Sequence, residues 1–451
     1  FDDRSFGVTA SVPTGWAVLA ITSVLALFRM GLFLTMTVVG FYVLGAVGAW
    51  RLSTVFPVNR ARIAGMVVYV ATPLVPGLMG SGDWSALAWY AALPWMVHLL
   101  RSTAGLAAAD PAADATDLAD GVAEVGIRHR VRSMAYLSLV LALTAAFVPL
   151  AVVLWAVAGL LLVLATLVAG SSWRVAAWFA AGTVVSVVVA LVLNLPWALD
   201  WTWAELTGAQ TAGASGNRTV DVATMAPDAM RFSILALALY LPVLAALAIT
   251  RAWRFTWSVR AAALVVGFGA LAVLADRAAL PVATPESTLL LVPVALGLAL
   301  GGAAIADGLG ADVLGRGFGW RQPVALLANI AIVVGLVPAV LSIGNGAWDA
   351  PRTPMSVLLS TQLPVDPVAG DHRVLYVGDP RLLPVPAKEY QPGIAWAVVD
   401  VGDFDFTDRF PVPASGGDAA VEHALDLIAS GSTLRAGHLL APLGIRFIIV
   451  P

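Results

Sequence analysis

Acidic side chains gather in short polar segments between long apolar runs, and they are the residues of this chain best suited to chemistry. Asp2 and Asp3 precede the first apolar run, Asp83 lies in a Gly-Ser-Gly-Asp-Trp sequence, and Glu286 lies in a Thr-Pro-Glu-Ser sequence. A carboxylate acts as a general base when it takes the proton of a hydroxyl group that is forming a new bond. These acids are therefore candidate catalytic or substrate-binding groups.

Two of these acids also have a purely structural interpretation. Asp83 directly precedes a helical pattern, so its side chain is suited to cap that helix. Glu286 shares a turn with Asp276 and Arg277, which indicates a local ion pair. Both interpretations stay open at this point.

A second group of polar residues follows Asn194, where three tryptophans (Trp197, Trp201 and Trp203) lie beside Asp200 and Glu205. Aromatic faces next to carboxylates suit a sugar ring, because the rings stack on its apolar face and the acids bind its hydroxyl groups. The alternative is an aromatic belt at the membrane surface, where tryptophan is common.

A phosphate could be bound by three arginines that also lie in polar segments between apolar runs, namely Arg218, Arg231 and Arg277.

Composition defines the setting in which these residues work. Of 451 residues, 60% are apolar and only 12% are charged, against about 25% charged in a soluble domain. The net charge of −3 argues against a nucleic-acid partner, and the absence of cysteine excludes disulfides and thiolate metal sites. The chain is therefore expected to be an α-helical polytopic membrane protein.

About twenty apolar residues are needed to cross a bilayer as a helix, and ten windows meet this requirement. They are 32–50, 61–78, 84–100, 132–149, 151–169, 174–194, 232–250, 260–276, 282–305 and 323–343. A further apolar run, 13–28, is expected to be an interfacial or re-entrant helix on the outer face, with an eleventh span as the alternative.

Arginine placement predicts the orientation. Arginines are concentrated in alternate connections, around Arg51, Arg101, Arg174, Arg251 and Arg321, and the positive-inside rule places these connections in the cytoplasm. The segments that carry the candidate acids, and everything after residue 343, are then expected outside. We therefore predict a multi-pass protein of the cell membrane with an extracytoplasmic C-terminal portion.

Three regions follow from this pattern. Residues 1–31 are expected to be the remnant of a first external loop with an interfacial helix, 32–343 the membrane domain, and 344–451 a truncated external α/β domain. In the last region, β-rich runs at 373–377, 394–399 and 446–450 surround helical stretches. No Walker-type loop or Gly-x-Gly-x-x-Gly motif supports nucleotide binding.

Several short motifs resemble those of a known family. They are the segments 61–73, 80–83, 91–95, 145–149, 375–381 and 434–450, the last running from Leu-Arg-Ala-Gly-His to Gly-Ile-Arg-Phe-Ile-Ile-Val. Together they are similar to actinobacterial polytopic GT-C-like membrane glycosyltransferases that carry an N-terminal family-2-type glycosyltransferase domain. The resemblance extends over nearly the whole chain, although each motif is short and apolar.

The resemblance implies transfer of a sugar from a polyprenyl-phosphate donor to a cell-envelope glycan on the outer face of the lipid bilayer. It implies a catalytic carboxylate ahead of an interfacial helix, for which Asp2 and Asp3 are available, with Asp83 in support. The substrate-binding expectations are Asp200, Trp201 and Glu205 on the acceptor side, Arg218 at the phosphate, and Glu286. No cofactor is expected in this chain, since a divalent metal would belong to an upstream domain.

Two other functions fit the same pattern. The chain could be a non-catalytic transporter or scaffold for envelope polysaccharide, in which case the external carboxylates would tolerate substitution. It could also be a membrane anchor whose enzymatic part is an upstream domain.

Overall fold

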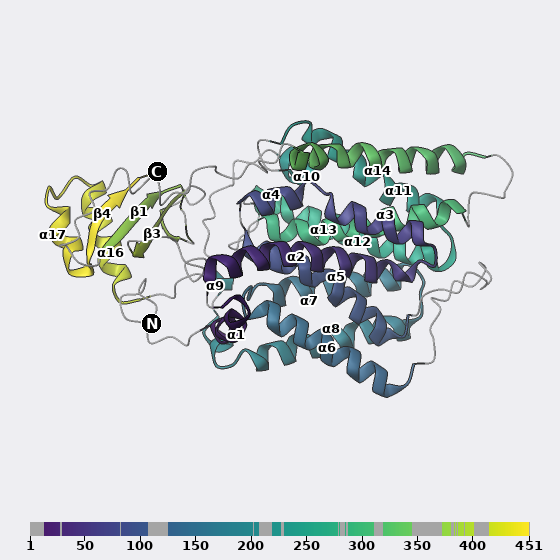
Figure 1. Cartoon of the computed structure of the whole chain (residues 1–451), viewed down its shortest axis with the longest axis horizontal. Helices are drawn as coiled ribbons and strands as arrows, with labels where there is room; N and C mark the ends of the chain where they lie inside the picture. Colours follow the sequence, from purple (N-terminus) through teal and green to yellow (C-terminus); the bar gives the residue numbers. More distant parts are fainter. Residues whose placement is uncertain are drawn as a thin grey trace.

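The computed structural model is a long bundle of helices with a small sheet domain beside one end (Figure 1). The structure describes residues 13–27, 29–81, 83–106, 125–201, 203–206, 219–226, 230–277, 279, 285, 287–310, 319–344, 372–379, 383, 385, 387–391, 393–400 and 415–450.

Most of the bundle consists of helices that run lengthwise (Figure 1). The longer ones are α2 (Met30–Leu52), α5 (Trp84–Ala104), α6 (Ile127–Ala145), α7 (Ala151–Val168), α8 (Trp173–Leu193), α12 (Ala252–Asp276), α13 (Ser287–Gly308) and α14 (Arg321–Gly344). The shorter ones are α3 (Asn59–Val70), α4 (Leu74–Ser81) and the 3-10 helix η4 (Ser233–Leu239), which continues as α11 (Tyr240–Ile249).

Six of these helices are long and apolar enough to cross a membrane, namely α2, α7, α8, α12, α13 and α14. A seventh candidate is the pair α3 and α4, which is bent by 42° at a short break where Pro73 prevents a continuous helix. The chain is therefore a multi-pass membrane protein. Each of the ten windows predicted from the sequence contains helical residues, although the start of 282–305 lies outside the described residues. Ten crossings stay a prediction.

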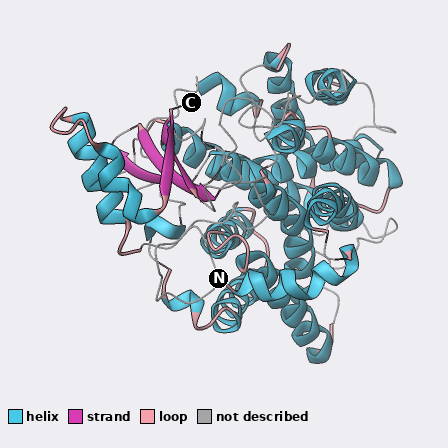
Figure 2. Cartoon of the chain, turned by 60° about the vertical axis from the view of Figure 1, so that its left-hand side comes forward, coloured by secondary structure: helices cyan, strands magenta, loops and turns pink. Residues whose placement is uncertain are grey.

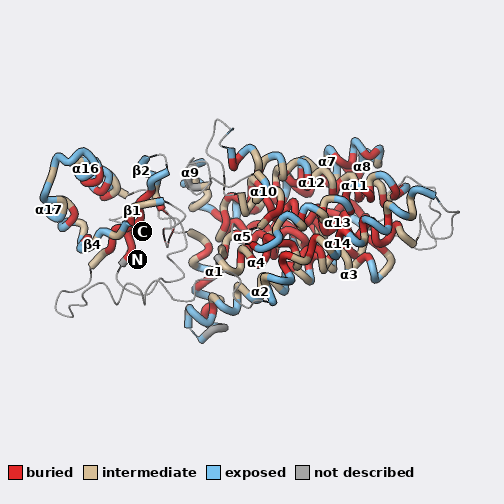
Figure 3. The backbone as a smooth tube through the Cα atoms, turned by 90° about the horizontal axis from the view of Figure 1, so that it is seen from above, coloured by how far each residue is buried: buried red, intermediate tan, exposed pale blue. Residues whose placement is uncertain are grey.

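The outward faces of the bundle are apolar, as a lipid environment requires. Leu139, Leu160, Val184 and Val333 are each between 55% and 68% exposed. Buried residues fill the interior of the bundle, and exposed ones cover its surface (Figure 3). An apolar surface of this extent is stable in hydrocarbon rather than in water.

Helix α13 is the centre of the bundle, since 94% of its apolar window is buried. It packs against α12, α3 and α11. Small residues allow neighbouring helices to approach closely. For example, a side chain on Gly45 of α2 would overlap the buried ring of Tyr90 in α5. Trp95 of α5 also donates its indole N–H to the carbonyl of Leu44 at 2.9 Å.

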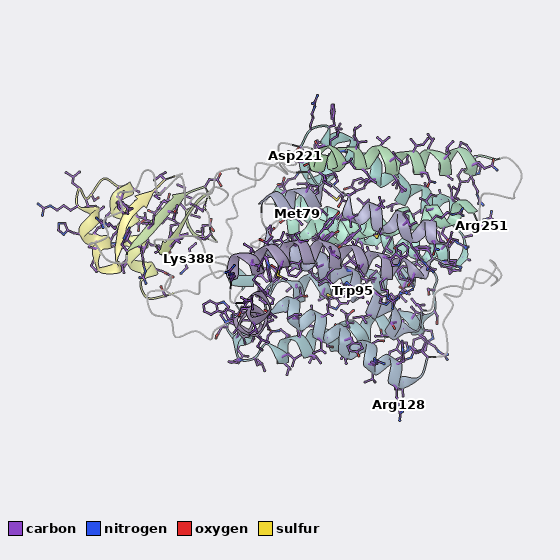
Figure 4. All side chains as sticks on the ribbon, in the orientation of Figure 1. Met79, Trp95, Arg128, Asp221, Arg251 and Lys388 are labelled. Carbon is purple, nitrogen blue, oxygen red and sulfur yellow. The ribbon has the colours of Figure 1, made fainter. Side chains whose placement is uncertain are left out.

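Hydrogen bonds show which helix ends lie together. At one end, the side chain of Arg60 bonds the carbonyl of Ala306, and Arg130 bonds the carbonyl of Thr103. At the other end, the side chain of Tyr240 bonds the carbonyl of Ala223. Figure 4 shows Arg128 and Arg251 toward the first end, and Met79 and Asp221 toward the end that faces the sheet domain.

The arginine-rich connections therefore share one end of the bundle, as the alternation in the sequence predicts.

The apolar run 13–28 forms α1 (Thr14–Thr22) and the 3-10 helix η1 (Ser23–Ala26). Nine α-helical residues extend about 14 Å at 1.5 Å per residue, which is too short to cross a bilayer. Gly15 lies so close to the carbonyl of Ala146 that a side chain there would overlap it. The interfacial role of this helix stays a prediction.

The C-terminal region contains a four-stranded sheet in the order β2-β3-β1-β4. Its strands are β1 (Arg373–Gly378), β2 (Lys388–Gln391), β3 (Ile394–Asp400) and β4 (Ile445–Ile449). β1 is antiparallel to β3, with Tyr376 opposite Ala397, and parallel to β4. Burial in this sheet raises the pKa of Tyr376 to about 12.

The helices α16 (Asp418–Ala429) and α17 (Ala436–Leu440) lie on one face of this sheet (Figure 2). Val421 and Leu425 of α16 pack with Leu375 and Trp396 of the strands. The predicted strands at 373–377, 394–399 and 446–450 are confirmed to within a residue or two, and β2 is an addition to them.

Candidate functional site

Asp83 links three helices at the end of the bundle that faces the sheet domain. It caps α5, because the backbone N–H of Ala86 donates to Asp83 Oδ1 at 3.0 Å. Thr288 at the start of α13 donates its hydroxyl to Asp83 Oδ2 at 3.4 Å, and the Asp83 N–H bonds the carbonyl of Leu78 in α4. The capping interpretation of Asp83 is therefore confirmed, and both carboxylate oxygens have neutral partners.

An aromatic cluster adjoins this carboxylate. The ring of Trp84 makes edge contacts with Phe41 and Phe147, with centroid separations of 5.0 and 4.9 Å. Its indole N–H donates to the hydroxyl of Thr37 at 3.0 Å. Asp83 is thus half-buried beside a rigid apolar wall that brings together α2, α5 and the turn after α6.

The Trp-rich segment after α8 forms the 3-10 helix η3 (Trp197–Leu199) and the short helix α9 (Trp203–Leu206). Trp197 and Trp201 meet at 89° with their ring centroids 5.2 Å apart. Trp201 packs on the bundle core, and its indole N–H has no hydrogen-bond partner among the described residues. Asp200, which lies between these tryptophans in the sequence, is exposed. The backbone of Glu205 belongs to α9, and its side chain lies outside the description.

Asn194 anchors this segment to the rest of the bundle. It is 1% exposed, and its amide donates to the carbonyls of Ala142 and Ala190 at 3.2 and 2.8 Å. Its amide oxygen accepts a hydrogen bond from the hydroxyl of Thr14 in α1. The Trp-rich segment, α1 and α6 are therefore held together at one end of the bundle.

A continuous chain of contacts joins the two groups of predicted site residues. Trp84, next to Asp83, touches Phe147, and Phe147 lies against Gly15 in α1. The neighbouring Thr14 bonds Asn194, six positions before Asp200. The structure thus brings Asp83, Asp200 and Trp201 to the same end of the bundle. The sequence predicted this grouping too, but from the placement of the arginines and not from contacts.

The remaining predicted site residues are not placed: Asp2, Asp3, Arg218 and Glu286 lie outside the described residues. Of the other two cations considered for a phosphate, Arg277 donates to the hydroxyl of Thr219 at 3.0 Å. Arg231 lies over the ring of Phe232, 4.8 Å from its centroid. Both are exposed at the end that carries Asp83.

One buried acid was missed in the sequence. Asp307, near the end of α13, has a side chain with 0% exposure that pairs with Arg254 Nε at 2.5 Å. Its Oδ1 atom has no hydrogen-bond partner among the described residues. The sequence did carry a signal for this ion pair. A single acid lies at the end of an otherwise apolar helix, and the helix before it in the chain begins with arginines.

No group of three or more potential metal ligands occurs in the part of the chain that the structure describes. The groups at the Asp83 end could orient a hydroxyl-rich substrate, because they combine carboxylates, tryptophan rings and exposed guanidinium groups. No protein-family model, curated protein or solved structure matches this chain.

Proposed function

We propose that the chain is the membrane module of a cell-envelope glycosyltransferase. In this proposal it belongs to the GT-C-like class, crosses the cell membrane ten times and presents the Asp83 end and the C-terminal domain to the outside. A sugar moves there from a polyprenyl-phosphate donor to an envelope glycan. The observation that carries the proposal is the grouping of Asp83, the Trp84 cluster and the Trp197–Trp201 pair at the end opposite the arginine-rich connections.

The ten crossings are supported by three further helical segments of the bundle. To the six apolar helices and the α3–α4 pair, the proposal adds α5, α6 and the segment Ser233–Ile249. All three run lengthwise in the bundle (Figure 1). The charges of α5 and α6 lie in the last turns of α5 and the first turns of α6, at the end where interfacial arginines are expected.

The proposed reaction needs a base, a phosphate site and an acceptor site. A carboxylate, Asp2 or Asp3, takes the proton of the acceptor hydroxyl as the new glycosidic bond forms. The bond between the sugar and the phosphate oxygen breaks, and polyprenyl phosphate leaves. Arg218 stabilises the charge on the leaving phosphate, while Asp200, Trp201, Glu205 and Glu286 bind the sugars.

Asp83 has a positioning role in this proposal. Both of its oxygens accept hydrogen bonds that join α5 to α13, so it fixes the helix ends around the site. It does not need to exchange protons for this purpose, because asparagine caps helices about as well as aspartate.

The test is sugar transfer by the full-length protein in liposomes with a labelled polyprenyl-phosphate sugar. Replacing Asp2 and Asp3 together by Asn is expected to abolish transfer, and Asp200→Asn to raise the acceptor KM. Asp221→Asn is the matched control, because Asp221 lies at the same end and has no assigned role (Figure 4). Transfer that survives every substitution would contradict the proposal and favour a transporter or scaffold.

A further inference from the structure

Three arginines from different helices converge on the turn between α2 and α3. Thr54 in this turn donates to the carbonyl of Arg51 at 2.7 Å and accepts a hydrogen bond from Arg101 Nη2 at 2.7 Å. Arg62 donates to the carbonyls of Phe56 and Pro57. The guanidinium groups of Arg62 and Arg101 therefore contact this turn, and Arg51 lies in the last turn of α2, which leads into it. Residues 51–62 together with Arg101 are here called the arginine turn.

The guanidinium of Arg101 is incompletely satisfied. Arg101 is 6% exposed, and its Nη1 has no hydrogen-bond partner among the described residues. Its Nε contacts His98 Nδ1 at 3.4 Å, which is a weak bond to a neutral acceptor. A buried donor without an acceptor is costly, more so when it is charged.

The arginine turn also concentrates positive charge. Arg51 and Arg62 place further positive charge beside Arg101, because Thr54 bonds both Arg101 and the carbonyl of Arg51, and Arg62 bonds carbonyls of the same turn. The guanidinium of Arg51 is exposed and makes no hydrogen bond to a described residue. Within the described ranges, Asp307 is the one carboxylate at this end of the bundle, and Arg254 already binds it. No described acid therefore neutralises the turn.

An apolar track leads from the arginine turn along the surface of α2. Val39, Val43 and Val47 are between 45% and 52% exposed, and Arg51 continues the same spacing of four residues. Residues four apart are neighbours on a helix surface, so these positions form a row that slants across α2. A hydrocarbon chain lying on these valines would have its polar end at Arg51.

We propose that the arginine turn binds the phosphate group of an anionic phospholipid, whose acyl chain lies along the Val39–Val47 face of α2. Guanidinium groups match phosphate oxygens with paired hydrogen bonds, and anionic lipids concentrate near basic segments at the cytoplasmic surface. The site is independent of sugar transfer and requires only that α2 crosses the membrane, which its apolar length supports.

The experiment measures thermal unfolding of the purified chain in a neutral detergent during titration with phosphatidylglycerol. Phosphatidylcholine and inorganic phosphate are titrated in parallel. Phosphatidylglycerol is expected to raise the unfolding midpoint, and the other two are not. The double variant Arg51→Gln, Arg62→Gln is expected to weaken the apparent affinity at least tenfold, which corresponds to about 1.4 kcal/mol.

Arg128→Gln is the matched control, because Arg128 is an exposed arginine at the same end of the bundle, on α6 (Figure 4). It is expected to keep the affinity of the wild-type chain. Equal stabilisation by phosphatidylcholine, an unchanged affinity in the double variant, or an equal loss in Arg128→Gln would overturn the proposal. Equal stabilisation by inorganic phosphate would overturn the assignment to a lipid.

The double variant replaces the exposed Arg51 and the half-buried Arg62 and leaves the buried Arg101 in place. Arg101→Lys adds a second test, since lysine keeps the charge but lacks the paired donors of the guanidinium group. It is expected to weaken phosphatidylglycerol binding severalfold. An unchanged affinity in this variant, with a normal unfolding midpoint, would exclude Arg101 from the site.

Discussion

The two ends of the helical bundle hold their carboxylates in different ways. At the arginine-rich end, Asp307 is fully buried and pairs with Arg254 at 2.5 Å. At the opposite end, Asp83 is half-buried and accepts hydrogen bonds from a backbone N–H and a hydroxyl. A buried charge that loses its partner is strongly destabilising, whereas a capping carboxylate contributes about 1 kcal/mol. The loss of the carboxylate is therefore expected to destabilise the first end more than the second.

The sharpest test of this comparison is whether the two ends lie on opposite sides of the membrane. The chain has no cysteine, so single cysteines can be introduced as Glu205→Cys, Glu422→Cys and Arg128→Cys. In intact cells, a membrane-impermeant maleimide is expected to label the first two and not the third. Each cysteine is expected to be either fully labelled or unlabelled in intact cells, and Arg128→Cys should react only after the membrane is permeabilised. Residues 205 and 422 on different sides would refute the orientation.

The next largest effect is expected at the buried ion pair. Asp307→Leu leaves the Arg254 guanidinium buried without its partner, which should cost about 3–5 kcal/mol. The measurement is the unfolding midpoint of the purified protein in detergent. The double variant Asp307→Leu, Arg254→Met is expected to recover most of the loss, because no unpaired charge remains. A single variant as stable as the wild-type chain would show that the pair does not stabilise this end.

A smaller effect is expected at Asn194, which joins α1 and α6 at the Asp83 end. Asn194→Ala removes hydrogen bonds to Thr14, Ala142 and Ala190, and the unpaired groups should cost about 1–3 kcal/mol. Trypsin cleavage at Arg29, which lies between η1 and α2, is expected to become faster. Asn329→Ala is the control, because Asn329 makes one local bond within α14; an equal acceleration in that variant would contradict the anchoring role.

The smallest effect distinguishes two roles of Asp83. Asp83→Ala removes the cap of α5 and should cost about 1 kcal/mol, whereas Asp83→Asn should change the unfolding free energy by a few tenths at most. In the transfer assay, the Asn variant is expected to keep most of its activity. If transfer is lost in Asp83→Asn while stability is retained, Asp83 is catalytic and not only a positioning residue.

The sequence predicted most of the architecture, because apolar length and arginine placement are local signals. Each predicted window contains described helical residues. The cap at Asp83 could be inferred from its position before Trp84. The break at Pro73 was also visible as a proline in an apolar run. These features depend on residues that are neighbours in the chain.

The parts that could not be predicted depend on contacts between distant residues. Asp307 and Arg254 are 53 positions apart, so the lone acid in α13 indicates that a partner is needed but not which arginine supplies it. Thr14 and Asn194 are 180 positions apart, and nothing in either segment shows that they meet. The predicted base and phosphate residues, Asp2, Asp3 and Arg218, stay predictions because they lie outside the described residues.

The central place of α13 has a consequence for biogenesis. A helix with 94% of its apolar window buried has almost no lipid-facing surface in the finished protein, yet it enters the membrane during synthesis. Its predecessor α12 carries Arg254, the partner of Asp307, and the two helices follow one another in the chain. We expect them to leave the translocon as a hairpin, in which the two charges already neutralise each other before the other helices assemble around it.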